Sequence, residues 1–175
     1  MKRTAFSGRM LLSMSLLLFF GCSSGGNSGN GGVAQQPATV IVKISAAGTL
    51  PAGSTIGGAD LSLTLPPGVV VRSSMGSLSA LVPDAGIVAA SGAAASNSRV
   101  YAVHTAVAGA VPGAVRILLA NTAGFASGEF AAVKCDIASG NTPTATDFSI
   151  SGAKFVDGNG KALTGLSTVV TADLQ

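Results

Sequence analysis

Residues 113–157 contain the sequence feature that most constrains the fold, which is a succession of short alternating segments separated by Gly-rich turns. Val115, Ile117 and Leu119 alternate with more polar or smaller residues. A second run covers residues 130–137, and one of its faces is apolar: Ala131, Val133, Cys135 and Ile137. The opposite face of that run holds Phe130, Ala132, Lys134 and Asp136. A period of two residues is typical of half-buried β-strands.

The alternation changes register after the turn-rich segment 139–143. Phe148 and Ile150 share one parity, whereas Phe155 has the other. Gly152 lies at the change, and glycine inside a strand is typical of a β-bulge. We therefore predict a bulge at Gly152 that returns Phe155 to the core.

Further segments between Gly and Pro turns also have strand character. They are residues 39–45, 60–65, 69–71, 99–107 and 166–174, the last with Leu166, Val170, Ala172 and Leu174 facing inward. The pattern is weakest in residues 73–98, where Gly92 interrupts an Ala-rich run that would otherwise suggest a helix, and we interpret this region as short strands and loops. Many short strands at this spacing predict an all-β, antiparallel sandwich over residues 37–175.

The N-terminus has the composition of an export signal. Lys2, Arg3 and Arg9 precede an apolar run that ends at Gly21-Cys22, and this run is too short to span a membrane. The segment Phe19-Phe-Gly-Cys22 resembles the bacterial lipoprotein box, although Phe19 and Phe20 depart from its usual pattern. The resemblance implies a lipoprotein signal peptide over residues 1–21, with lipidation at Cys22. The alternative is an ordinary signal peptide with an incidental cysteine.

Residues 22–36 are rich in Gly, Ser and Asn, which predicts a flexible tether that carries the domain away from a membrane. Ser23 follows the cysteine, and by resemblance to the common sorting rule it favours the outer membrane. Without the signal peptide, the chain has seven basic and seven acidic residues. A neutral domain without a basic cluster argues against nucleic acid as a partner.

The sequence contains no recognisable catalytic or metal motif, so we expect no enzyme activity and no cofactor. His104 is the single histidine, and no nucleophile motif accompanies it, so we interpret it as a histidine on a sheet surface. We expect Cys135 to be a buried, unreactive residue, and the alternative is an intermolecular disulfide. Asp157-Gly-Asn-Gly160 lacks the later ligands of a calcium loop and is interpreted as a turn. Glu129 and Asp136 have opposite parity on one strand, which disfavours a glycosidase pair.

The segments VRILLAN, GFASGEFAAVKCDI and FSISGAKFVDGNGKAL together resemble the cohesin-type domain, loosely over Val40 to Leu174. The resemblance implies a jelly-roll β-sandwich of about nine strands and a non-catalytic role in protein–protein interaction. Cohesins are receptors for dockerins, which are small calcium-loaded helical modules, so a dockerin-like partner is implied. The resemblance identifies no binding face.

Two alternatives remain open on the sequence. Cohesins share their fold with polysaccharide-binding modules, but such sites need flat aromatic platforms, and the predicted domain has one Tyr, four Phe and no Trp. A structural envelope lipoprotein that uses the fold without a dockerin partner is the other.

Overall fold

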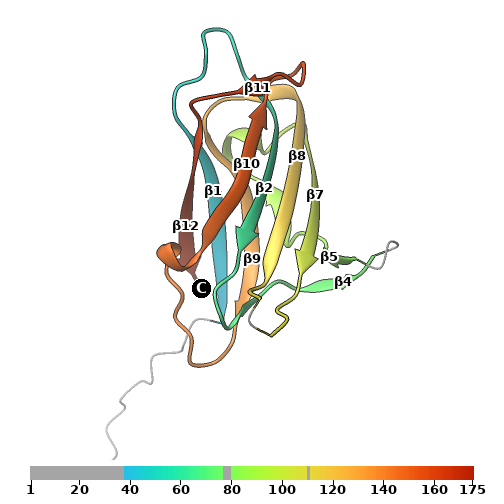
Figure 1. Cartoon of the computed structure of the whole chain (residues 1–175), viewed down its shortest axis with the longest axis vertical. Coiled ribbons are helices and arrows are strands. Elements are labelled where there is room, and N and C mark those ends of the chain that lie inside the picture. The colour runs from blue at the N-terminus through green and yellow to red at the C-terminus, as the bar shows by residue number, and fades with distance from the viewer. Residues whose placement is uncertain (1–37, 77–79, 110) are drawn as a thin grey trace, which may run out of the picture. The chain divides into compact units, whose positions relative to one another are not determined.

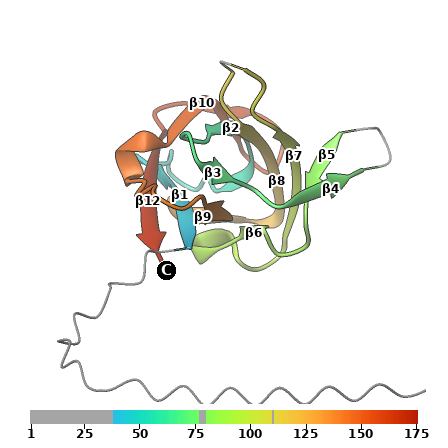
Figure 2. The ribbon, with the colours of Figure 1, turned by 90° about the horizontal axis from the view of Figure 1, so that it is seen from below.

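The computed structural model describes residues 38–76, 80–109 and 111–175, and in this part of the chain two antiparallel sheets pack face to face (Figures 1 and 2). The expected signal peptide, Cys22, the whole of the expected tether and the first residue of the expected domain, Pro37, lie outside the described residues. Within those residues, no helix has the length and apolar character needed to cross a membrane.

The first sheet has β1 at its centre. Its strands, in spatial order, are β12 (Ser167–Leu174), β1 (Thr39–Ala47), β9 (Gly128–Ile137) and β3 (Val69–Val70), and β6 (Val88–Ala90) also pairs with β9. Its inner face carries Val40, Val42 and Ile44, which are fully buried.

The second sheet lies in front of the first in Figure 1. Its order is β11 (Ala162–Leu163), β10 (Ser149–Val156), β2 (Ile56–Thr64), β8 (Ala114–Phe125), β7 (Ser98–Thr105), β5 (Leu81–Pro83) and β4 (Ser73–Met75). Two short 3₁₀ helices, η1 (Gly92–Ala94) and η2 (Ala145–Asp147), lie in the connections. The chain crosses repeatedly between the two sheets, as β1, β2 and β3 show.

The predicted fold class, an antiparallel jelly-roll β-sandwich, is confirmed. The described residues form twelve strands instead of about nine. The additional strands are short: β4, β5 and β6 come from residues 73–98, and β11 has only two residues. Too few residues alternate in these strands to give a readable period. The Ala-rich run becomes β6 and the single turn η1, with Gly92 at a positive φ of 51°.

One face assignment in the sequence was wrong: Phe130 is fully buried instead of facing away from the core. The pairing of β1 with β9 shifts between Ile44 and Ser45, where Ala131 and Glu129 are their respective partners. Phe130 is thus the extra residue of a bulge, which lets both Phe130 and Ala131 face the core. Leu174, expected to face inward, is 43% exposed because it lies at the end of the last strand.

The predicted bulge at Gly152 is confirmed. The pairing of β10 with β2 shifts between Ser151 and Lys154, and Gly152 has a φ of 64°. As a result Phe155 is only 4% exposed and meets Phe130 edge to face, with ring centroids 5.8 Å apart. The Phe125 ring also lies close to Phe130, with ring centroids 6.0 Å apart. These three rings join the two sheets near the end where β8 ends and β9 begins.

The conformation of Gly152 gives a test of the bulge. A Cβ there would meet no atom within 4 Å, so Gly152→Ala changes only backbone strain. Because an L-residue at this φ is disfavoured, we expect a loss of about 1 kcal/mol in the free energy of unfolding, measured with urea. Gly158→Ala is the matched control, since Gly158 is equally open and has no positive φ. Equal stability of the two variants would contradict the assigned conformation.

Candidate binding surface

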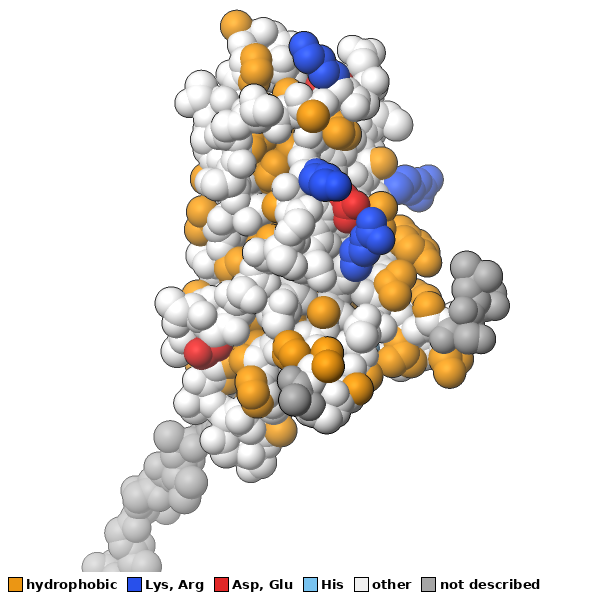
Figure 3. Space-filling view, viewed as in Figure 1, with side chains coloured by type: hydrophobic (Ala, Val, Ile, Leu, Met, Phe, Trp, Pro, Cys, Tyr) orange, Lys and Arg blue, Asp and Glu red, His pale blue; other side chains and the backbone are white. Residues whose placement is uncertain are grey.

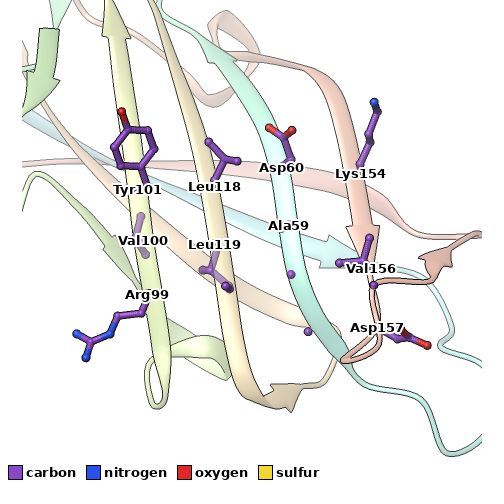
Figure 4. Close-up of a pocket in the computed structure, with 14 residues that line it drawn as sticks. Ala59, Asp60, Arg99, Val100, Tyr101, Leu118, Leu119, Lys154, Val156 and Asp157 are labelled. Atoms are coloured by element: carbon purple, nitrogen blue, oxygen red, sulfur yellow. The ribbon is translucent and has the colours of Figure 1, made fainter. Parts of the chain in front are cut away.

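The outward face of the second sheet holds the best candidate for a binding surface. One row across four strands consists of Lys154, Asp60, Leu118 and Tyr101, each paired with the next in the strand register. Figure 4 shows these side chains on β10, β2, β8 and β7. The free face of an antiparallel sheet is usually polar. Here Leu118 lies at its centre and the Tyr101 ring is 53% exposed.

The next row supplies a floor of small residues. It consists of Val156, Gly58, Ala120 and Arg99, again in strand register. A Cβ on Gly58 would approach both the Leu119 carbonyl oxygen and Val156 Cγ2 to 3.1 Å, so a larger residue would crowd this floor. The two rows line a shallow open groove of about 660 Å³, and its surface is mainly apolar. We call it the β2–β8 groove.

Some of the charged side chains around the β2–β8 groove are paired within the protein, and others are not. Arg116 donates two hydrogen bonds to the Asp60 carboxylate, at 3.1 and 2.9 Å. These bonds, more than the charge itself, hold the pKa of Asp60 below its usual value. Arg99 and Lys154 form none of the ion pairs found among the described residues. Neither of these two cations is tied up in such an ion pair, although the charge of Lys154 also helps to lower the pKa of its neighbour Asp60. Figure 3 shows blue and red side chains grouped on this face, with apolar side chains beside them.

The sequence did not identify this groove. Alternation placed Leu118 and Ala120 correctly on the side facing away from Ile117 and Leu119, but it could not show which strands lie beside β8. An apolar residue as large as Leu118 at an outward position was the available signal. Leu118 becomes part of a groove only together with Val156, which lies some forty residues later in the sequence. The strand β2 lies between β8 and β10 and so brings the two residues to the same face.

Polysaccharide binding finds little support in the described aromatic residues. Tyr101 is exposed, whereas Phe125, Phe130, Phe148 and Phe155 are at most 5% exposed. A lone ring does not form the flat row on which successive sugar rings stack.

His104 does not lie on the sheet surface, and that expectation was wrong. It faces inward with Val100 and Ala102 and is 8% exposed, and β5 and β4 extend the sheet beside this part of β7. Its Nδ1 lies 2.9 Å from the Ser73 hydroxyl. Burial lowers the pKa of His104, so the neutral ring is favoured. A serine–histidine pair alone, without an acid or an oxyanion site shown beside it, does not make a catalytic triad.

Two carboxylates considered for a glycosidase pair are far apart. The bulge at Phe130 places Glu129 and Asp136 on the same outward face of β9, so their assumed opposite parity was wrong. They still lie about 20 Å apart along the strand, at ~3.3 Å per residue, whereas glycosidase carboxylates are about 5–9.5 Å apart. Asp136 also accepts hydrogen bonds from Arg72 at 2.6 and 2.8 Å.

The remaining candidates have structural surroundings. Cys135 is fully buried without a disulfide partner among the described residues, and burial raises its pKa to about 12. Asp157 Oδ1 accepts hydrogen bonds from the backbone N–H groups of Asn159 and Lys161, both at 2.9 Å, and so closes the turn between β10 and β11. The described residues contain no group of three or more His, Cys, Asp or Glu side chains that could hold a metal ion.

The burial of His104 predicts a pH dependence of stability. The unfolded chain binds a proton at this residue below about pH 6.5, whereas the folded domain binds it only at lower pH. The free energy of unfolding should therefore fall between pH 7.5 and pH 5.5. His104→Gln should show a smaller fall in urea titrations at the same two pH values, and an unchanged fall would contradict the burial effect.

Comparisons with known proteins give one weak likeness. No protein-family model matches the chain, and no curated protein matches it. Among solved structures, the chain is similar to a non-cellulosomal cohesin from the hyperthermophilic archaeon Archaeoglobus fulgidus, with 14% sequence identity and a TM-score of 0.47. The match covers 74% of this chain and 75% of the cohesin. A likeness of this strength assigns neither a family nor a function to the chain.

Proposed function

We propose that this protein is a non-catalytic, lipid-anchored protein of the cell envelope whose cohesin-like sandwich binds another protein at the β2–β8 groove. The observation that carries the proposal is the groove itself: an apolar, glycine- and alanine-floored depression on a sheet face that would ordinarily be polar. An exposed apolar depression with a polar rim is typical of an interaction site.

The groove favours a protein ligand over a small molecule. It is open and shallow, whereas small-molecule sites enclose most of the ligand surface. Leu118 and Tyr101 provide an apolar centre, and Arg99 and Lys154 stand at its border. A matching partner would present an aliphatic side chain close to one or two carboxylates.

A dockerin-like module is the finer proposal for the partner. It rests on the resemblance of the sequence to cohesins and not on a contact in the structure. Because dockerins hold calcium, binding would depend on calcium in the partner. This domain would need no metal ion of its own.

The anchor is proposed from the sequence alone. Cys22 would carry the lipid, and the following Gly- and Ser-rich residues would hold the domain at the membrane, with the outer membrane favoured by Ser23. A membrane-attached receptor then keeps its partner at the cell surface.

Binding at the β2–β8 groove is tested with surface variants. Tyr101→Ala removes an exposed ring, and Ala120→Gln places a polar side chain on the groove floor. Each should weaken the capture of a partner from envelope and secreted fractions at least about tenfold, because central contacts dominate interface energies. Val169→Gln is the matched control, since Val169 is 47% exposed on the other sheet.

Calcium dependence separates the finer proposal from the broader one. A partner that is lost in the presence of a chelator and that carries calcium loops is dockerin-like. A partner that is retained with a chelator, yet lost with Tyr101→Ala, keeps the groove and removes the dockerin proposal. Capture that is unaffected by both groove variants contradicts the binding face.

The lipid anchor has its own test. Cys22→Ala removes the only thiol that the proposed lipid could modify at the signal junction, so the protein should move from the membrane fraction to the soluble fraction. Gel mobility and fractionation measure this change. A variant that stays in the membrane fraction with unchanged mobility contradicts lipidation at Cys22.

A further inference from the structure

The strand ends define one end of the sandwich as the point where the chain enters the domain. β1 begins there at Thr39, which pairs with Asp136 near the end of β9. Val40 pairs with Leu174 near the end of β12. In the second sheet, β2 ends and β8 begins at the same end, at the lower edge of Figure 1. We call this the entry end.

Exposed apolar side chains gather at the entry end. The described residues expose seven large hydrophobic side chains, and four of them lie here: Val70 (49%), Val107 (55%), Val111 (57%) and Leu174 (43%). Val107 and Val111 belong to the β7–β8 connection. The described connections at the opposite end contribute none of the seven.

Much of the connecting chain at the entry end has no charged side chain. Segments 66–68, 106–113 and 138–144 contain only apolar, small or uncharged polar residues. Charges do lie beside them: Asp147, which caps η2, the ion pair between Arg72 and Asp136, and the ion pair between Lys43 and Asp173, which precedes Leu174. An apolar, uncharged surface has a low cost of transfer to the headgroup region of a bilayer.

The length of chain between the proposed lipid and the domain limits how far the entry end can lie from the membrane. Fifteen residues separate Cys22 from Ala38, so even a fully extended chain keeps Ala38 within about 50 Å of a lipid at Cys22. Val107 and Val111 alone would bind a bilayer weakly. A tether of this length raises the effective concentration of lipid, so that weak contacts become occupied.

We propose that the entry end rests on the surface of the lipid bilayer through Val70, Val107, Val111 and Leu174. This inference depends on the proposed anchor for its setting, although the contact itself is made by the folded domain. It places the long strands steeply to the membrane and leaves the β2–β8 groove facing sideways, open to a partner.

The test supplies the anchor artificially, so that it does not depend on lipidation in the cell. Residues 23–175, with a hexahistidine tag in place of the preceding residues, are bound to phosphatidylcholine vesicles that contain a nickel-chelating lipid. Within the described residues, the buried core cluster lies between Val40 and Phe155, all of which this protein retains. Ala106→Cys carries an environment-sensitive fluorophore at the entry end, and Cys135 stays unlabelled because it is fully buried.

Nitroxide-labelled lipid should quench the probe at Ala106→Cys at least about twofold more than the same probe at Ala52→Cys, in an exposed connection at the opposite end. Val107→Ser combined with Val111→Ser should abolish the difference. Val169→Ser is the control substitution and should leave it intact.

Equal quenching at Ala106→Cys and Ala52→Cys, or quenching unchanged by the double serine variant, overturns the proposal. Because the tag provides attachment, a failure of the Cys22→Ala fractionation test would remove the lipid anchor without altering this readout. Loss of partner capture in the groove variants is likewise measured separately.

Discussion

The contact between Phe130 and Phe155 is the interaction on which the sandwich depends. Each ring comes from a different sheet, and each reaches the core only because its strand contains one extra residue. One bulge in each sheet is thus needed to bring these two rings into contact. With Phe125 beside them, these rings form a large apolar cluster between sheets whose other core residues are mostly Val, Leu, Ile and Ala.

The same bulge that buries Phe155 also determines the outer surface. Since neighbouring residues in a strand face opposite ways, returning Phe155 to the core turns Lys154 and Val156 outward. Both residues line the β2–β8 groove. The core and the candidate binding surface therefore share one structural cause, and neither can change register without the other.

Local periodicity was sufficient to predict much of the fold, because strands of eight or more residues repeat their pattern several times. It predicted the alternating faces of β8 and most of β9, and Gly152 was a usable signal for its bulge. It failed at Phe130, since no glycine marks that bulge. It also failed at His104, which lies on the inward face of β7 with the short strand β5 paired beside it in the sheet.

The groove required information that no local pattern contains. Its floor combines Gly58 with Ala120, and its walls combine Val156 with Tyr101, from four strands that are neighbours only after folding. The sequence narrowed the possible functions, because it contains few residues of the kinds that catalytic and metal sites require. It could not locate a binding face, because the position of that face depends on the order of the strands in the sheet.

The position of β1 has a consequence for how the chain reaches its folded state. β1 lies between β9 and β12, so the first strand to emerge waits for partners that come from the last third of the sequence. Contacts of such long sequence separation form late and slow the search for the native state. Under the export that we propose from the sequence, this ordering would keep the polypeptide open during transit and delay closure until its C-terminal strand has arrived.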